Sequence, residues 1–161
     1  PLKDVLLLDE WYYLAILNLV TCEDFRDETT WIAQRLRLPA PTAKSAWERL
    51  VQLGFVEKRS GAWQKSRHRA RFPNTIPYLK KQRYYRQHFQ KAIEVLTTQT
   101  SPEDFKHRLI NGMTVATNAH NVEKAKILLE RTLGELAELL SAGDADRVYQ
   151  MSVQLIPLTK E

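Results

Sequence analysis

The chain has 161 residues, of which 24 are lysine or arginine and 19 are aspartate or glutamate, for a formal net charge of +5. Its hydrophobic fraction of 43% and charged fraction of 27% are typical of one folded domain or two small ones. No apolar run approaches the roughly 20 residues that a membrane span needs, so we expect no membrane association. Cys22 is the single cysteine, which excludes an internal disulfide and favours a reducing, cytoplasmic compartment.

Apolar residues recur at helical spacing three times in the first third of the chain. This pattern predicts helices over residues 11–20, 30–36 and 40–53. Asp27 or Thr29 is expected to cap the second helix, because short polar side chains accept hydrogen bonds from the first-turn amides.

A glycine and two short runs of strand-forming residues follow the third helix. Gly54 follows the third predicted helix, at the position where a glycine in the left-handed conformation commonly ends a helix. Residues 55–58 and 62–65 flank Arg59-Ser60-Gly61, which predicts a two-stranded hairpin with a short glycine turn. Three helices and a hairpin in this order are typical of a winged helix-turn-helix, which we expect over residues 1–72.

The middle of the chain returns to a helical pattern after a connector. Residues 66–77 have no period and contain two prolines. A long helix is predicted over residues 78–97, with an aromatic and aliphatic stripe on one face and many cations on the other. A further short helical turn is expected within residues 103–109.

The last third of the chain predicts strand, helix and strand. Residues 113–117 and 147–158 alternate between apolar and polar side chains, and residues 122–140 between them read as a helix capped by Asn118 or Asn121. Two strands make a marginal sheet, so either the first half covers them or a second copy of the chain completes the sheet. We favour the second copy, which supplies the twofold symmetry common among helix-turn-helix proteins.

The predicted fold is therefore mainly α within the α+β class. It consists of a winged helix-turn-helix over residues 1–72 and, over residues 73–161, a long helix with a strand-helix-strand region for dimerisation or effector binding. A homodimer is expected.

Positive charge is concentrated in residues 57–91. This stretch holds eleven lysines and arginines against one acid, Glu57, for a local charge of +10, so the rest of the chain sums to −5. The cations are Lys58, Arg59, Lys65, Arg67, Arg69, Arg71, Lys80, Lys81, Arg83, Arg86 and Lys91. A local basic field beside a groove-reading element indicates nucleic-acid binding.

The third predicted helix presents a polar face suited to the major groove of DNA. Its outward positions are Thr42, Lys44, Ser45, Glu48, Arg49 and Gln52. Lys44 and Arg49 suit guanine edges or phosphates, and Thr42 and Ser45 can reach phosphates or bases. Glu48 could accept a hydrogen bond from cytosine or pair with Lys44 at four-residue spacing. A solvated helix face is the alternative interpretation.

The predicted hairpin and its continuation carry a second set of candidate DNA contacts. These are Lys58, Arg59, Lys65, Arg67, Arg69 and Arg71. In an extended chain, residues 65, 67, 69 and 71 project to the same side, and a one-sided row of cations fits a phosphate backbone or a minor groove. The alternative is a solvated linker whose charges serve solubility.

The sequence gives no support for an enzyme or for a bound cofactor. It has five glycines and neither a glycine-rich phosphate loop nor a nucleophile elbow. The four histidines stand apart from one another and from Cys22, so no metal site is predicted.

Short motifs along the chain carry a resemblance to a known family. They are Glu10-Trp11-Tyr12, Trp31-Ile32-Ala33, Leu53-Gly54-Phe55, Tyr85-Arg86-Gln87, Val148-Tyr149-Gln150 and Pro157-Leu158-Thr159-Lys160. In these the chain resembles an uncharacterised family of predicted bacterial transcriptional regulators of the Bdellovibrio and Fibrobacter type. Members of that family usually carry this segment as a C-terminal domain of unknown function behind a separate helix-turn-helix. The resemblance implies regulation of transcription and no known ligand or target.

Two functions follow as expectations. The first is a DNA-binding transcriptional regulator, or the DNA-binding and dimerisation domain of one, whose partners are double-stranded DNA and a second copy of the chain. The second is a protein-interaction or small-effector sensor module, in which the winged helix is a scaffold and an unidentified effector or partner protein binds elsewhere.

Overall fold

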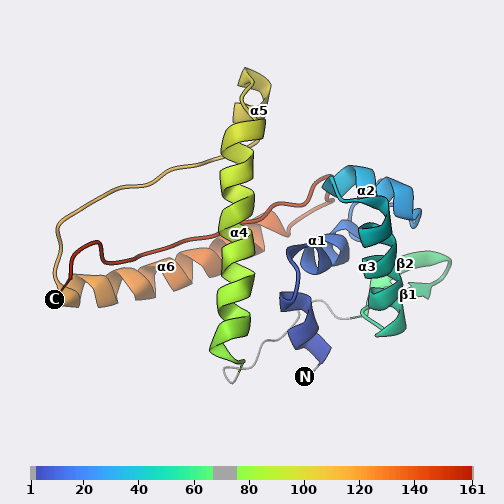
Figure 1. The fold of residues 1–161 in the computed structure, drawn as a ribbon, viewed down its shortest axis with the longest axis horizontal. Coiled ribbons are helices and arrows are strands. Elements are labelled where there is room, and N and C mark those ends of the chain that lie inside the picture. The colour runs from blue at the N-terminus through green and yellow to red at the C-terminus, as the bar shows by residue number, and fades with distance from the viewer. Residues whose placement is uncertain (1–2, 67–75, 161) are drawn as a thin grey trace. The chain divides into compact units, whose positions relative to one another are not determined.

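The structure is a computed structural model that describes residues 3–66 and 76–160. Within these residues it is a mainly helical α+β fold with seven helices and one two-stranded antiparallel hairpin (Figure 1). The chain divides into two compact units. Unit 1 comprises Pro1–Ile93 with Asp144–Gln150, and unit 2 comprises Glu94–Gly143 with Met151–Glu161. The boundary predicted between residues 72 and 73 lies outside the described residues.

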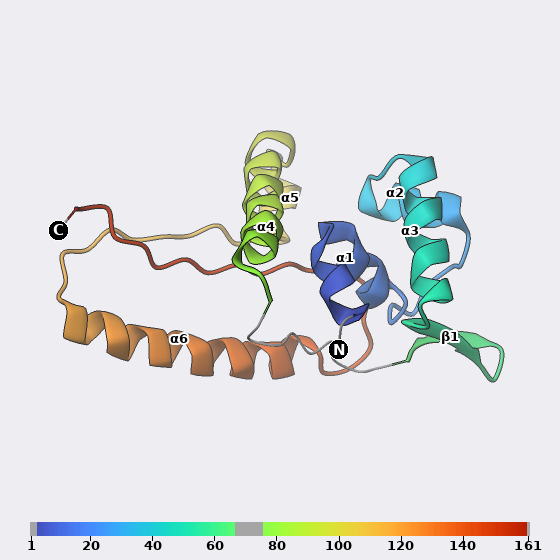
Figure 2. The same ribbon diagram turned by 60° about the horizontal axis from the view of Figure 1, so that its bottom comes forward.

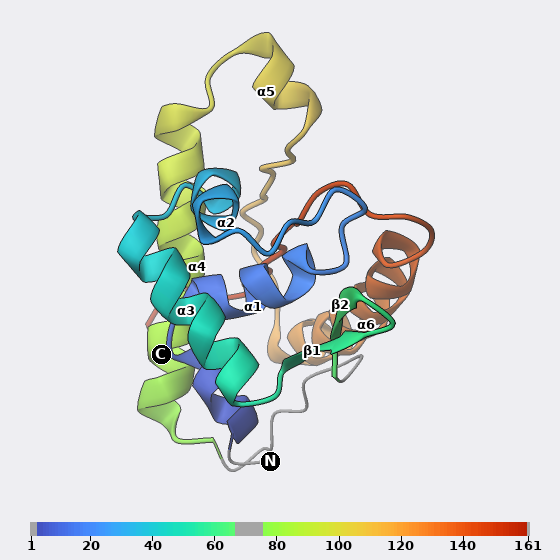
Figure 3. The same cartoon turned by 90° about the vertical axis from the view of Figure 1, so that its right-hand side faces the viewer.

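Unit 1 begins with four helices. They are the 3₁₀ helix η1 (Lys3–Leu8), α1 (Trp11–Leu19), α2 (Thr29–Leu36) and α3 (Ala40–Gln52). The predicted helices α1, α2 and α3 are confirmed to within about two residues at each end, while η1 was not predicted. The helices α2 and α3 pack against each other, and both contact α1 (Figure 3).

Capping of α2 differs from the prediction. Its N-cap residue is Glu28, and no side chain caps it. Asp27 instead accepts a hydrogen bond from the indole of Trp63, at 2.7 Å between Oδ2 and Nε1. The expected cap at Asp27 or Thr29 is therefore wrong, because a distant tryptophan competes for the Asp27 carboxylate.

The turn between α2 and α3 and the end of α3 both use left-handed backbone. Arg37 ends α2 with φ of 53°, and its amide donates to the last turn of that helix. Pro41 lies in the first turn of α3, where a missing amide hydrogen costs nothing. Gly54 follows α3 with φ of 67°, which confirms the predicted left-handed cap.

The hairpin consists of β1 (Val56–Arg59) and β2 (Ala62–Lys65) and continues directly from α3 (Figure 3). Arg59 pairs with Ala62 across the turn, so two residues form the loop. Ser60 and Gly61 have φ of 51° and 85°, the positive values that a type I′ turn requires at both central positions. This turn matches the twist of the strands and fixes their register.

Helix α4 (Tyr78–Thr98) belongs to unit 1 as far as Ile93 and holds the start of α1. The N-cap residue of α1, Glu10, makes no capping hydrogen bond with its own side chain. The amide of Trp11 donates instead to Oε1 of Gln87 at 2.7 Å, and Nε2 of Gln87 donates to the carbonyl of Asp9 at 3.0 Å. A residue of α4 thus satisfies the first amide of α1.

Residues Asp144–Gln150 return to unit 1 from the far end of the sequence. The amide of Glu23 donates to the carbonyl of Ala145 at 2.9 Å, which forms a parallel bridge between Cys22 and Ala145. Arg35 donates to the carbonyl of Asp146 at 2.7 Å. These contacts tie a late segment to the loop between α1 and α2.

The hydrophobic core lies in unit 1. Its buried residues are Leu7, Tyr13, Ile16, Leu17, Leu19, Val20, Cys22, Ile32, Ala33, Ala43, Ala46, Trp47, Leu50, Phe55 and Val56. Ala145 and Val148 of the returning segment pack against this core. No described residue of unit 2 is buried.

Unit 2 contains the end of α4, one short helix and one long helix. Helix α5 (Pro102–Lys106) starts with a capping box between Ser101 and Asp104, and α6 (Ala119–Leu140) starts where Asn118 accepts from the amide of Asn121 at 3.0 Å. The helix predicted over residues 122–140 is confirmed, although it begins three residues earlier, and of the two predicted caps, Asn118 and Asn121, it is Asn118 that caps it.

The strands predicted at 113–117 and 147–158 are not formed within the single chain. Both segments run without helical or strand structure, and the hairpin is the sole sheet among the described residues (Figures 1 and 2). Alternating side chains specify which way a strand would face, but a strand also needs a partner to pair with its backbone. The chain supplies no such partner here.

A membrane crossing requires a longer and more apolar helix than any found in the described parts of the chain.

Candidate nucleic-acid interface

Helix α3 separates an apolar face from a polar one. Its buried residues are Ala43, Ala46, Trp47 and Leu50. On the opposite side Lys44, Ser45 and Arg49 are exposed, and Thr42 is half-buried. The four α3 residues predicted to contact DNA therefore lie at or near the surface of unit 1. The same helix is anchored to the core, which fixes the direction of its polar face.

One of these cations has an acidic neighbour on the same helix. Nζ of Lys44 is 4.0 Å from Oε1 of Glu48, the four-residue pair expected from the sequence. Both side chains are nearly two-thirds exposed, so the pair contributes little to stability and leaves Lys44 able to exchange partners.

Aromatic packing attaches the hairpin to α3. The rings of Trp47 in α3 and Trp63 in β2 meet edge to face, with centroids 5.0 Å apart. Phe25 packs against Trp47 from the loop before α2, at 5.7 Å between ring centroids. Edge-to-face aromatic pairs are favourable beyond the area they bury, so they hold the hairpin at one angle to the helix.

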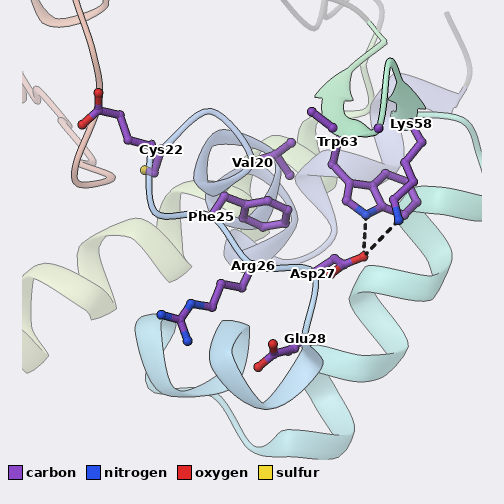
Figure 4. Close-up of a pocket in the computed structure, with 11 residues that line it drawn as sticks. Val20, Cys22, Phe25, Arg26, Asp27, Glu28, Lys58 and Trp63 are labelled. Carbon is purple, nitrogen blue, oxygen red and sulfur yellow. Dashed lines mark hydrogen bonds and ion pairs between the residues drawn. The ribbon is translucent and has the colours of Figure 1, made fainter.

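Asp27 collects two contacts from the hairpin. Besides the hydrogen bond from Trp63, its Oδ2 is 3.7 Å from Nζ of Lys58 (Figure 4). The hydrogen bond from Trp63 and the charge of Lys58 together lower the pKa of Asp27 below its usual value. Lys58 also lies over the Trp63 ring, 5.4 Å from its centroid. Sequence reasoning missed this cluster, because its members lie far apart along the chain.

Two further predicted DNA contacts already have partners within the hairpin and α1. Arg59 pairs with Glu57 at 2.6 Å. Nζ of Lys65 donates to Oδ1 of Asn18 at 2.7 Å, and burial lowers the pKa of Lys65. Lys65 is half-buried, and its hydrogen bond to Asn18 joins β2 to α1. A ligand would have to compete with this contact for the ammonium group. Arg59 remains largely exposed, and its surface pair can open at little cost.

The other predicted wing contacts, Arg67, Arg69 and Arg71, lie outside the described residues.

Two cations of α4 pair with acids of the same unit, and a third lies over an aromatic ring. Lys80 pairs with Asp9 at 2.8 Å, and Arg83 pairs with Glu10. Lys91 lies over the Trp11 ring, 4.2 Å from its centroid. The sequence counted these charges as part of one basic field. The structure shows that α4 uses them to dock on the segment between η1 and α1.

A shallow groove of about 420 Å³ lies beside the Asp27 cluster. It is lined from three elements by residues that include Arg26, Glu28, Lys58 and Trp63 (Figure 4). The lining mixes both charge signs with an aromatic face, which suits a small polar ligand or a partner side chain. In the described part of the chain, no three His, Cys, Asp or Glu side chains gather in a way that could hold a metal ion.

Comparison with known proteins identifies one family. The family model described as "Domain of unknown function (DUF4423)" matches residues 3–158, nearly the whole chain. No curated protein and no solved structure matches the chain. The match confirms that the chain is of an uncharacterised family, and it adds nothing on transcriptional regulation.

Proposed function

The chain belongs to the DUF4423 domain family, and we propose that it is a DNA-binding transcriptional regulator or the DNA-binding and dimerisation part of one. In this proposal η1 to β2 form a winged helix-turn-helix, with α3 as the recognition helix and the β1–β2 hairpin as the wing. A homodimer would present two such units to the two half-sites of a palindromic site.

One observation carries the proposal. Helix α3 exposes Lys44, Ser45 and Arg49 along one face while its other face is fixed in the core, and a cationic hairpin is packed against the same helix. Side chains of this kind match the donors that read guanine and phosphate oxygens in the major groove. The short turn between α2 and α3 gives the helix pair that such proteins use.

The arrangement of charges supports a modest rather than a large electrostatic contribution to DNA binding. Several cations of residues 57–91 are paired with acids of unit 1, namely Lys58, Arg59, Lys80 and Arg83. Surface pairs of this kind exchange readily for phosphate, because each is worth about 1 kcal/mol or less. We therefore expect non-specific binding that is weak at physiological salt and strengthens steeply as salt is lowered.

The proposal is tested by fluorescence anisotropy with a random duplex between about 50 and 200 mM salt. We expect the logarithm of the affinity to fall linearly with the logarithm of the salt concentration, with a slope near −0.9 for each phosphate contacted. No binding at low salt, or binding indifferent to salt, would contradict the proposal.

Arg49→Ala tests whether α3 faces the duplex. If Arg49 contacts a phosphate, the slope should change by about one; if it contacts a base, affinity for a selected site should fall by about 1–3 kcal/mol. Arg86→Ala removes the same charge from an exposed position of α4, outside α3 and the hairpin, and serves as the matched control. Equal losses from both variants would argue against α3 as the reading element.

The groove beside Asp27 favours a second candidate, a sensor module that binds a small polar effector or a partner protein. Thermal-shift measurements with nucleotides and polar metabolites would separate the two functions. A shift that Trp63→Ala abolishes, in a protein that does not bind DNA at low salt, would favour the sensor.

A further inference from the structure

We infer that unit 2 is completed by a second copy of this chain, which pairs with the two extended segments 109–118 and 151–158 and covers the exposed apolar face of α6. The inference deepens the homodimer of the proposed function by naming its interface. It does not rest on DNA binding, because it concerns how unit 2 acquires a core.

The first observation is that apolar exposure is concentrated in unit 2. Fifteen large apolar side chains there are between 46% and 89% exposed, whereas no described residue of the unit is buried. They are Leu96, Phe105, Leu109, Ile110, Met113, Val115, Ile127, Leu128, Leu139, Leu140, Met151, Val153, Leu155, Ile156 and Leu158. Single exposed apolar residues are ordinary, but fifteen of them in one unit without a buried residue indicate an interaction surface.

The second observation concerns the two extended segments. Residues 109–118 and 151–158 contain no charged side chain in a chain that is 27% charged. Among the described residues, the carbonyl of Asn118 accepts from the amide of Val122 in α6, and no backbone hydrogen bond joins residues 109–117 or 151–158 to another element. Exposed strand edges are normally protected by lysine, proline or a bulge. Residues 109–118 hold neither lysine nor proline, and in 151–158 the one proline, Pro157, is the last residue but one. A neutral, apolar and unpaired segment of this kind is a template for strand addition.

The two segments also lie in the order that builds a sheet. One precedes α6 and the other follows it, and both run in the same direction, opposite to α6 (Figures 1 and 2). Strand, helix and strand in this arrangement form the usual βαβ unit once the strands are paired. In the single chain the pairing is absent, and a strand from another chain supplies it.

Helix α6 gives the third observation. It has 22 residues and none is buried. Val122, Leu129, Leu133 and Leu136 form a half-buried stripe, while Leu128, Leu139 and Leu140 beside it are exposed. Helices in proteins draw most of their stability from packing an apolar face. A helix of this length with no buried residue therefore needs a further surface to pack against.

A second copy fits this surface better than another partner does. The fifteen exposed side chains offer roughly 900 Å² at about 100 Å² for each fully exposed side chain, close to the about 800 Å² per partner of a standard interface. The surface that needs cover is apolar and uncharged, which does not fit nucleic acid. A second copy brings the same two unpaired segments and the same apolar helix face. In a twofold-symmetric dimer each chain therefore pairs the segments and covers the helix face of the other.

Light scattering on the 161-residue chain tests the inference in the absence of DNA. We expect a mass of twice the 18.8 kDa of one chain at tens of micromolar. A monomer at that concentration overturns the inference, whatever the outcome of the DNA measurements.

A matched pair of variants locates the interface. Leu155→Glu and Gln154→Glu introduce the same charge at adjacent exposed positions of one segment. Neither should unfold a monomer, because both side chains already face solvent in the single chain. We expect Leu155→Glu to raise the dimer dissociation constant by about 100-fold or more, since a charge is then buried in an apolar contact, and Gln154→Glu to change it much less. Equal effects from the two variants overturn the assignment of Leu155 to the interface.

Amide hydrogen exchange separates strand pairing from side-chain contact. We expect the amides of residues 113–117 and 151–155 to be protected in the wild-type protein and to exchange rapidly in Leu155→Glu, while those of α3 stay protected in both. Protection that persists in a monomeric Leu155→Glu would show that the chain covers these segments by itself, and would refute the second copy.

Discussion

His88 is a buried titratable side chain whose environment disfavours its charge. It lies on α4, and its ring is 4.0 Å from that of Tyr84 between centroids. Gln150 of the returning segment donates to the backbone carbonyl of His88 at 3.2 Å. Burial lowers the pKa of His88 below the usual value of 6.5, so protonation of this imidazole opposes folding.

The lowered pKa predicts that stability falls on acidification. The unfolded chain takes up a proton on His88 near pH 6.5, whereas the folded chain resists until a lower pH. Stability from this group is therefore complete above about pH 6.5 and is lost as the pH falls toward the folded pKa. We expect urea midpoints to drop between about pH 7.5 and 5.5, and His88→Gln to flatten that dependence.

The control for this measurement is His120→Gln, at an exposed position of α6. The control should keep the wild-type slope of stability against pH. If both variants show that slope, His88 is not responsible for it.

At the scale of elements, the capping of α1 by Gln87 is the contact that fixes α4. The helix begins without a capping side chain of its own, and Gln87 satisfies its first amide from 76 residues away. Ion pairs of Lys80 and Arg83 lie about two turns and one turn before Gln87 along α4. Surface ion pairs contribute little to stability. The two partly buried hydrogen bonds of Gln87 therefore contribute most to the docking of α4 on the start of α1.

Gln87→Ala should lower the free energy of unfolding by about 1 kcal/mol, because it leaves the Trp11 amide without a partner. Gln90→Ala removes the same side chain from an exposed position of the same helix and should change stability by less than about 0.5 kcal/mol. Chemical denaturation of the two variants measures the difference. A smaller loss for Gln87→Ala than for Gln90→Ala would show that α1 is capped in another way.

The sequence predicted elements well where the signal is local. Periodic apolar residues gave α1, α2, α3, α4 and α6, and Gly54 and Asn118 marked two helix ends correctly. Patterns that depend on a distant partner failed. Asp27 was expected to cap α2 but accepts a hydrogen bond from Trp63, 36 residues away. The hydrogen bond from Lys65 to Asn18, 47 residues away, was not anticipated, while the phosphate contact of Lys65 stays a prediction. The periodicity of apolar residues indicates which face of an element is buried. It does not indicate which polar side chains form hydrogen bonds with each other.

The tail shows the same limit for strands. The alternation in residues 147–158 is the cleanest in the chain, yet the single chain forms no strand there. Alternation describes how side chains would face across a sheet. Whether a sheet exists depends on a second strand with free backbone groups, which one sequence read in isolation does not specify.

At the scale of the whole molecule, the returning segment Asp144–Gln150 is part of unit 1 although it follows unit 2 in sequence. Its contacts to Glu23 and Arg35 come from near its start, and its contact to His88 comes from its last residue. Ala145 and Val148 add apolar packing against the core. The stability of unit 1 therefore depends on residues that a cut at the end of α6 would remove.

Two truncations test this dependence. A chain that ends at Gly143 loses the returning segment, whereas one that ends at Gln150 keeps it, and both lack residues 151–161. We expect the shorter chain to be less stable by about 2 kcal/mol or more, since three hydrogen bonds and two packed side chains are lost. Thermal unfolding by near-ultraviolet circular dichroism gives the comparison. Equal midpoints for the two chains would mean that unit 1 holds itself together without this segment.

The path of the chain has a genetic consequence. The polypeptide passes from one unit to the other three times, after Ile93, Gly143 and Gln150. Neither unit corresponds to a contiguous stretch of coding sequence, so no single recombination event could deliver one of them intact to another gene. We therefore expect the two units to be inherited together, and the family model indeed spans residues 3–158 without a break.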